Sequence, residues 1–221
     1  LNLLEWSPQN ILSVALDSAL YMWNGNKNKV VRFCDINPSS VTSIAWNQSG
    51  SHISIGNNQG VTEIWDFEKN AKVIDMFGHN ARVSSLSWSG NLLASGSRDR
   101  TINLHDTRMN SREIVSIYQG HTQEVCGLKW SFDGQSLASG GNDNKLMIWN
   151  THSTVPVNKF NQHCAAVKGL AWNPHNHGVL ASGGGSADRT IKFWNTLDGT
   201  LLDSIDTGSQ ICNLIFSKTT K

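Results

Sequence analysis

The stretch "GHTQEVCGLKWSFDGQSLASGGNDNKLMIWN", Gly120 to Asn150, decides the fold because its pattern recurs on both sides of it. The preceding copy reads "GHNARVSSLSWSGNLLASGSRDRTINLHD" from Gly78, and the following copy reads "QHCAAVKGLAWNPHNHGVLASGGGSADRTIKFWN" from Gln162. Each copy has a run ending in Trp, a polar turn, the run Leu-Ala-Ser-Gly, a turn containing Asp, and a run ending in Trp or His. A more polar, variable stretch follows each copy. We therefore expect three short alternating strands and a looser, outermost fourth strand in each repeat.

The tryptophans show the period of this repeat, because all nine fall into two registers. The first register is Trp6, Trp46, Trp88, Trp130 and Trp172, spaced by 40, 42, 42 and 42 residues, and Phe216 extends it after 44 more. The second register is Trp23, Trp65, Trp149 and Trp194, with His105 at the missing place. A period of about 40–45 residues with four strands in each repeat is typical of the blades of a β-propeller.

Dipeptides at fixed places in the repeats resemble the WD-repeat family, whose signature is Gly-His early and Trp-Asp late in each blade. Gly78-His79, Gly120-His121 and Trp65-Asp66 match, whereas repeats one, four and five end in Trp-Asn. The resemblance implies an all-β WD-repeat β-propeller with about five of an expected seven blades in this chain. We expect a single, incomplete propeller domain over 1–221. Its repeats lie at about 1–34, 35–77, 78–119, 120–162 and 163–207, with the start of a sixth at 208–221, where "ICNLIFS" is the first strand.

An acidic residue recurs six positions before the second-register residue, in the turn that precedes the third strand. This position holds Asp17, Asp99, Asp143 and Asp188, and Gln59 in repeat two. Histidines also recur every 42 residues, at His79, His121 and His163. A buried carboxylate needs hydrogen-bond donors because leaving it unpaired costs several kcal/mol. An imidazole N–H at a fixed place is a suitable donor.

In the WD-repeat family, Asp, His, Ser or Thr, and Trp form a hydrogen-bonded network inside a blade. By position, the resemblance assigns this network to His79, Ser95 and Asp99 in repeat three, to His121, Ser139, Asp143 and Trp149 in repeat four, and to His163, Ser182, Asp188 and Trp194 in repeat five. Because His105 replaces the Trp of repeat three, we expect that network to be weaker. A His–Asp–Ser set also suggests a catalytic triad. A catalytic set occurs once, however, whereas this one recurs, so the repetition favours a structural role.

Composition and charge exclude several function classes. The net charge is +1, which argues against a broad electrostatic footprint for nucleic acid or an anionic membrane. No apolar run approaches the ~18 residues of a membrane helix, and the first residues do not resemble a signal peptide.

The four cysteines contain no C-x-x-C pair, so we expect reduced thiols. His175 and His177 in "PHNHG" lack a further ligand cluster, so we predict a solvated turn, no metal, no cofactor and no enzyme activity.

Several segments are too long for a chance match between WD repeats. They are "EVCGLKW", "LASGGNDNKL", "AAVKGLAWNPH", "LASGGGSADR" and "DTGSQICNL". They resemble the Fizzy and Fizzy-related family, the substrate-recruiting coactivators of the anaphase-promoting complex, a ubiquitin ligase. "SGSRDR", "KFWNT" and "DTGSQ" favour the Fizzy-related branch. The resemblance implies partners among the subunits of that complex, degron-bearing substrates and pseudosubstrate inhibitors, and a location in the nucleus and cytoplasm.

The resemblance also implies a binding site for one degron, the KEN box, on the top face of the propeller. Carried over by position, its residues are Asn142, Asn144, Ser186 and Gln210. The physical argument is that the turns before the third strands open onto one face, and that side-chain amides offer both donors and an acceptor to a peptide. Asn142 and Asn144 flank Asp143, whereas the same places hold Arg98 and Arg100 in repeat three and Ala187 and Arg189 in repeat five. The competing interpretation is that all four are ordinary turn residues.

A second hypothesis for the whole chain remains open. It is a shortened WD-repeat scaffold of the same lineage that interacts with proteins without binding degrons. The resemblance assigns no residues here to a destruction-box pocket or to segments that dock on the ligase.

Overall fold

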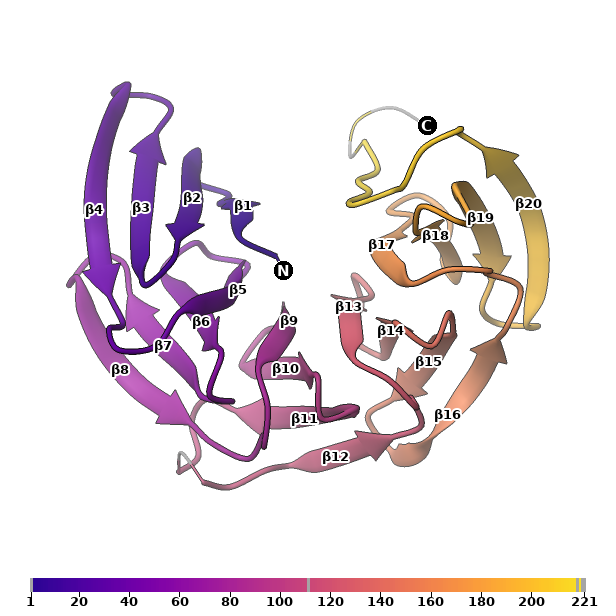
Figure 1. Cartoon of the computed structure of the whole chain (residues 1–221), viewed down its shortest axis with the longest axis horizontal. Coiled ribbons are helices and arrows are strands. Elements are labelled where there is room, and N and C mark those ends of the chain that lie inside the picture. The colour runs from indigo at the N-terminus through magenta and orange to yellow at the C-terminus, as the bar shows by residue number, and fades with distance from the viewer. Residues whose placement is uncertain (1, 111, 218, 220–221) are drawn as a thin grey trace. The chain divides into compact units, whose positions relative to one another are not determined.

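The computed structural model describes residues 2–110, 112–217 and 219, and all of its regular structure is β-strand (Figure 1). The chain divides into two compact units, Leu1–Ile117 and Tyr118–Lys221, which are described separately below. The strands of the first unit are β1 (Leu4–Trp6), β2 (Ile11–Leu16), β3 (Ala19–Asn24), β4 (Lys29–Asp35), β5 (Val41–Trp46), β6 (His52–Asn57), β7 (Thr62–Asp66), β8 (Ala71–Met76), β9 (Val83–Ser89), β10 (Leu92–Ser97) and β11 (Thr101–Asp106). The boundary between the units falls within β12 (Ser116–Gln119). Those of the second unit are β13 (Val125–Trp130), β14 (Ser136–Gly141), β15 (Leu146–Asn150), β16 (Ser153–Phe160), β17 (Val167–Trp172), β18 (Val179–Gly184), β19 (Thr190–Asn195) and β20 (Thr200–Asp206).

These strands form five four-stranded sheets, each in chain order: β1–β4, β5–β8, β9–β12, β13–β16 and β17–β20. Neighbouring strands such as β1 and β2, β14 and β15, and β18 and β19 pair antiparallel, as expected for strands joined by short turns. The prediction of an all-β chain with four strands in each repeat is confirmed. The repeat boundaries and the single-domain assignment stay predictions.

Burial follows the expected order of strands within a sheet. Every residue of β5 is buried, and the Leu-Ala-Ser-Gly strands β10, β14 and β18 are buried except at their first residues. At the outer edge, β20 is exposed along its whole length. A strand buried on both faces needs small or apolar side chains throughout, and the Ala, Ser and Gly of these second strands meet that need.

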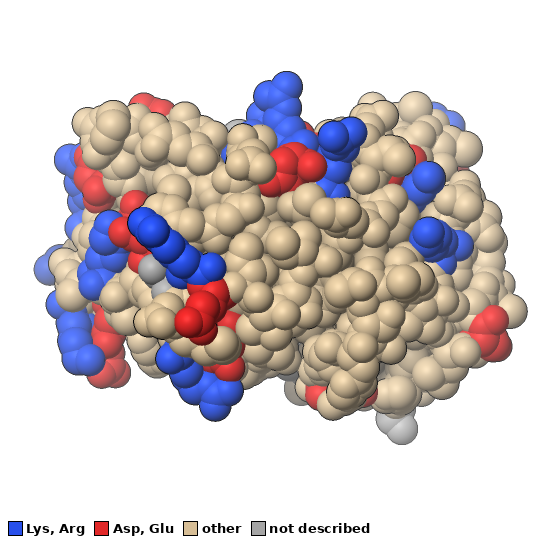
Figure 2. All heavy atoms as spheres, turned by 90° about the horizontal axis from the view of Figure 1, so that it is seen from below, with Lys and Arg blue, Asp and Glu red and all other residues tan. Residues whose placement is uncertain are grey.

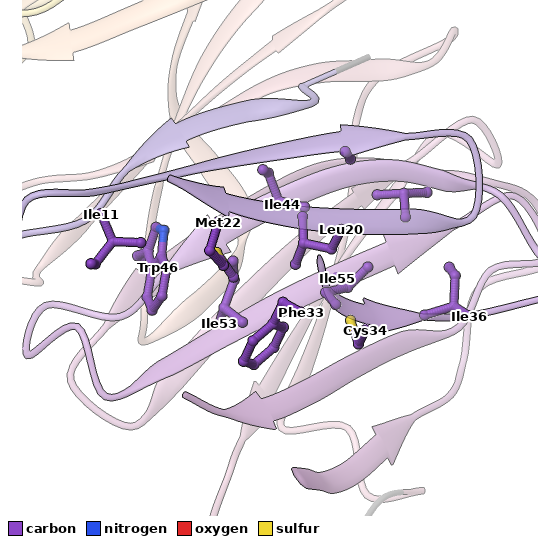
Figure 3. Packing of buried hydrophobic residues seen from close by; sticks show 12 residues of the cluster. Ile11, Leu20, Met22, Phe33, Cys34, Ile36, Ile44, Trp46, Ile53 and Ile55 are labelled. Carbon is purple, nitrogen blue, oxygen red and sulfur yellow. The ribbon is translucent and has the colours of Figure 1, made fainter. Parts of the chain in front are cut away.

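Apolar side chains of neighbouring sheets pack together in the first unit (Figure 3). Ile44, Ile53 and Ile55 of the second sheet lie with Leu20 and Met22 of the first in one buried cluster. Cys34 belongs to the same cluster, and burial raises the pKa of its thiol to about 12. That cysteine therefore packs as an apolar group and is not a thiolate at neutral pH. A second cluster in the second unit includes Leu146, Val167 and Trp194.

The predicted first strand of a sixth repeat does not form. Residues 211–217 form no strand, and within the described residues their one backbone–backbone bond joins Ile211 N–H to Gly184 C=O at 3.1 Å. An extended segment becomes part of a sheet only when a neighbouring strand accepts and donates along its length. No such neighbour is present among the described residues. Residues 218, 220 and 221 of the predicted sixth repeat lie outside them.

Surface charges of both signs are interspersed on the face shown in Figure 2. Exposed lysines also form short ion pairs, such as Lys69–Asp66 and Lys72–Asp75, each at 3.0 Å. No helix in the described part of the chain could serve as a membrane span.

Candidate functional site

The turn between β14 and β15 is held by Asp143. Its carboxylate accepts hydrogen bonds from His121 Nδ1 at 3.0 Å, from the Thr122 N–H at 2.8 Å and from the Lys145 N–H at 3.3 Å. Burial acts to raise the pKa of Asp143, but the bonds from His121 and Thr122 outweigh it and hold that pKa at about 2. The side chain is only 3% exposed, so this charged group is fixed inside the sheet rather than offered to a ligand.

Behind this turn, a chain of hydrogen bonds runs across the fourth sheet. Trp149 Nε1–H donates to Ser139 Oγ at 2.7 Å, and Ser139 Oγ lies 2.8 Å from His121 Nε2. The roles fit a neutral imidazole that accepts the serine hydroxyl at Nε2 and donates Nδ1–H to Asp143. The set predicted for repeat four is therefore brought together in one continuous chain.

The fifth sheet contains the same chain. Trp194 Nε1–H donates to Ser182 Oγ at 2.7 Å, Ser182 Oγ lies 2.6 Å from His163 Nε2, and His163 Nδ1 lies 2.5 Å from Asp188. Burial lowers the pKa of His163, although the Asp188 carboxylate acts to raise it. A neutral imidazole is the form that this bonding pattern needs.

These sets cannot work as nucleophilic triads. Ser139 and Ser182 are fully buried, and each hydroxyl oxygen already accepts an indole N–H while its proton is directed to the histidine. A nucleophile must reach a substrate atom, and these oxygens have no access to one.

The third sheet keeps His, Ser and Asp but lacks the indole. His79 Nδ1 lies 2.9 Å from Asp99, and His79 Nε2 lies 2.9 Å from Ser95 Oγ. His105, at the place of the missing Trp, directs its Nε2 to the Phe77 carbonyl oxygen at 3.0 Å instead. Ser95 therefore receives no donor from this position.

The recurring Asp position does not produce the same contact in every repeat. Asp17 of the first repeat is exposed, and its side chain forms no hydrogen bond with the described residues. In the second repeat, where Gln59 stands, the buried Asn57 holds the turn by accepting from the Gln59 and Val61 N–H groups, both at 3.0 Å. Sequence reasoning missed Asn57, since it lies two residues before the counted position.

The two asparagines beside Asp143 differ from each other. Asn142 is exposed, its backbone N–H bonds the Glu124 carbonyl at 2.8 Å, and its side-chain amide has no partner within the described residues. Asn144 has a φ of 63°, a left-handed conformation that Asn tolerates better than most residues. Its Nδ2 also donates to the Cys164 carbonyl at 3.1 Å. Asn144 is thus partly a turn residue, while Asn142 is free to meet a ligand.

Cys164 connects the two neighbouring turns. Besides accepting from Asn144, its backbone N–H donates to Asp188 Oδ1 at 3.2 Å, and Asp188 lies in the turn between β18 and β19. Ser186 is exposed in that same turn. Nothing in the sequence pattern pointed to Cys164, because both of its contacts use backbone atoms.

Gln210 reaches the same end of the sheets. The Thr207 N–H and Thr207 Oγ1 both bond the Arg189 carbonyl, at 3.0 and 2.9 Å, and the Ile211 N–H bonds the Gly184 carbonyl at 3.1 Å. These bonds bind the segment before and after exposed Gln210 to the β18–β19 turn. The structure therefore gathers all four predicted residues at one end of the second unit. We name this surface the amide turns: Asn142, Asn144, Ser186 and Gln210.

The histidines of "PHNHG" have other partners. His175 Nε2 lies 3.2 Å from the Ser217 carbonyl oxygen, and His177 Nε2 lies 2.9 Å from Asp133 Oδ2. Among the described residues, no group of three or more His, Cys, Asp or Glu side chains could hold a metal ion.

Four-stranded antiparallel sheets with Trp–Ser–His–Asp chains define a WD-repeat β-propeller. A model of the CDC20/Fizzy WD40 domain matches residues 1–221, so the chain belongs to the CDC20/Fizzy WD40 family. The resemblance predicted from the sequence is confirmed.

Several relatives and solved structures are similar over nearly the whole chain. B-type cell cycle switch protein ccs52A of Medicago truncatula is 52% identical over 219 residues, covering 99% of this chain and 46% of that protein. Protein FIZZY-RELATED 3 of Arabidopsis thaliana is 51% identical, covering 99% of this chain and 45% of that protein. The Anaphase-promoting complex subunit cdh1 of Dictyostelium discoideum is 43% identical, covering 99% of this chain and 33% of that protein. These names agree with the predicted Fizzy-related branch.

A chain in the crystal structure of a mitotic checkpoint complex matches with a TM-score of 0.97 and 42% identity, over 100% of this chain and 68% of that chain. A computationally designed protein, Ika8, matches with a TM-score of 0.80 at 24% identity, which shows the fold alone. The chain spans about half the length of the curated relatives that it matches most closely among these.

Proposed function

We propose that this chain is the degron-reading part of a coactivator of the anaphase-promoting complex, and that the amide turns bind the KEN box of a substrate. The supporting observation is that three exposed polar side chains lie at one end of the second unit and have no hydrogen-bond partner among the described residues: Asn142, Ser186 and Gln210. Family membership supports the wider role, because relatives bear the names Fizzy-related and Anaphase-promoting complex subunit.

The chemistry of these groups suits an extended polar peptide. An amide side chain donates and accepts at once, so Asn142 and Gln210 can each bond a backbone N–H and a backbone C=O, or the side chains of Glu and Asn. Asn144 contributes its carbonyl oxygen, since its Nδ2 is directed to Cys164. The network beneath holds the turns in place before the peptide arrives, which lowers the entropy lost on binding.

The role is one of binding rather than catalysis. The proposed partners of the chain are the subunits of the anaphase-promoting complex, degron-bearing substrates and pseudosubstrate inhibitors. The proposed location is the nucleus and cytoplasm. The solved relative in a mitotic checkpoint complex supports an inhibitor among these partners.

Titration of a fluorescent peptide containing Lys-Glu-Asn, with a scrambled peptide as control, tests the proposal. We expect weak but saturable binding, because a short disordered peptide loses conformational entropy when it is bound. The double variant Asn142→Ala, Asn144→Gly should lose it, and glycine keeps the left-handed φ of position 144 available. A well-folded chain that binds neither peptide would favour the second candidate, a WD-repeat interaction scaffold without degron binding.

A further inference from the structure

A pocket lies at the opposite strand ends from the amide turns. Strand β14 runs from the turn at 131–135 to the turn at 142–145, and β18 runs from the turn at 173–178 to the turn at 185–189 (Figure 1). The pocket is lined by residues of the first turn in each pair, with Trp172, Thr196 and Leu197. It therefore belongs to a different surface from the proposed degron site.

The rim of this pocket is organised by hydrogen bonds. His177 Nε2 lies 2.9 Å from Asp133 Oδ2, which joins the β17–β18 turn to the β13–β14 turn. Asn173 Oδ1 accepts the His175 and Asn176 N–H groups at 2.8 and 3.1 Å, and Thr196 bonds the Gly178 carbonyl through both N–H and Oγ1 at 2.8 Å. The opening is thus present before any partner binds.

Two large apolar side chains at the opening of the pocket are exposed to solvent. Phe132 is 64% exposed and Leu197 is 68% exposed, and both line the pocket beside the buried Trp172. The pocket measures about 250 Å³. Small-molecule and cofactor sites usually have roughly 300–1,000 Å³, so a single large side chain is a better match than a free metabolite.

The charged residues near the pocket indicate which residue type should lie beside that side chain in a partner. The turns at this end of the second unit are residues 131–135, 151–152, 173–178 and 196–199, and they contain Asp133 and Asp198 but no Lys or Arg. The hydrogen bond from Ser131, aided by the Gln135 N–H, lowers the pKa of Asp133 to about 2. The hydrogen bonds from Thr200 likewise lower the pKa of Asp198. Both groups are therefore anionic at neutral pH, and they complement a cationic partner.

We propose that this pocket docks a short peptide segment of a partner protein in which a large apolar side chain adjoins Lys or Arg. The apolar side chain packs between Phe132 and Leu197 above Trp172, and the cation pairs with Asp133, which lines the pocket. This acidic-rim pocket lies at the other end of the sheets from the amide turns, so both peptides can be bound at once.

Selection from a displayed library of random short peptides on the 221-residue chain tests the inference. Peptides that pair Phe, Trp, Leu or Met with Lys or Arg should be enriched. Their binding should weaken about tenfold in Phe132→Ser, Leu197→Ser, which removes the apolar contacts, and several-fold in Asp133→Asn. Asp203→Asn is the matched control, because it removes an exposed carboxylate from β20.

The double variant Asn142→Ala, Asn144→Gly separates the two sites. Enriched peptides should bind it as they bind the unaltered chain. Enrichment of acidic peptides, or of peptides whose binding is lost in this double variant and kept in the pocket variants, would overturn the inference. So would a selection that enriches no peptide sensitive to Phe132, Leu197 or Asp133 while circular dichroism shows all variants folded.

Discussion

The third sheet, β9–β12, and the fourth, β13–β16, contain the same His–Ser–Asp set but differ beside it. The fourth has Trp149, whose indole donates to Ser139, and Met147 in register with that serine. At the same two places the third has His105, which bonds elsewhere, and Asn103, which is fully buried with neither amide atom hydrogen-bonded within the described residues. The difference teaches that His and Asp hold the turn by themselves, while the indole and an apolar neighbour complete the interior.

The largest effect should come from making the fourth sheet resemble the third. We expect Trp149→His to lower the free energy of unfolding by about 3 kcal/mol, because a fully buried ring is lost along with its contact to Tyr118 and its bond to Ser139. Chemical denaturation measures this loss. Trp23→His is the matched control, because Trp23 occupies the same place in the first sheet but is only half-buried. It should lower the free energy of unfolding much less. Equal losses in both variants would contradict the importance of the network.

The next effect concerns the residue that holds the turn. Asp143→Asn should cost about 2 kcal/mol, because His121 Nδ1–H and the Thr122 N–H would face an amide that cannot accept from both as a carboxylate does. Asp17→Asn changes the counterpart in the first repeat, which is exposed, and should leave the midpoint of denaturation unchanged. A large loss in the Asp17 variant would show that the carboxylate stabilises this turn even where it is exposed.

A smaller effect of opposite sign should come from repairing the third sheet. Asn103→Met places there the residue of the fourth sheet and removes a buried amide that has no hydrogen-bond partner in the described part of the chain. We expect stabilisation by about 1 kcal/mol, seen as a higher melting temperature. Gly78 lies against Asn103 as Gly120 lies against Met147, so a methionine at 103 would again face a glycine. A lower melting temperature would mean that Asn103 has a bonding partner in solution.

The smallest effect concerns pH. Burial lowers the pKa of His105 and the pKa of His163 below the ordinary value of 6.5. Each is therefore neutral in the folded chain while its unfolded counterpart gains a proton, so stability is complete above pH 6.5 and falls as the pH decreases. Between pH 7 and 5.5 we expect at most about 1 kcal/mol for each histidine. Denaturation curves at the two pH values, repeated with His105→Gln, measure its share. A His105 share that does not change with pH would contradict the lowered pKa of that imidazole.

Sequence periodicity predicted the strands because a residue repeated every 42 positions occupies the same place in each sheet. The resemblance to the WD-repeat family, applied by position, assigned the His, Ser, Asp and Trp that lie together in the third to fifth sheets. It did not reveal that Asp17 is exposed, that Asn57 holds the second turn, or that Asn103 lacks a partner, because each depends on what surrounds that one residue. The segment 211–217 was wrongly predicted as a strand, since a pattern cannot supply the neighbour that a strand needs.

The amide turns also include features that the sequence predicted and features that only the structure shows. Asn142 and Asn144 both depart from the repeat, and that departure marked them together as candidates. Only the structure distinguishes them, because the Asn144 bond to Cys164 joins residues 20 apart through a backbone carbonyl. Asn144 is therefore partly required by its turn, and Asn142 carries the greater weight in the proposed recognition.

The most direct test is one variant, Asn142→Ala, measured for both stability and binding. Its melting temperature should equal that of the unaltered chain, since the side chain is exposed and has no internal partner within the described residues. Its dissociation constant for a Lys-Glu-Asn peptide, measured by isothermal titration calorimetry, should increase about tenfold. An unchanged dissociation constant would contradict the claim that the amide turns read such a peptide.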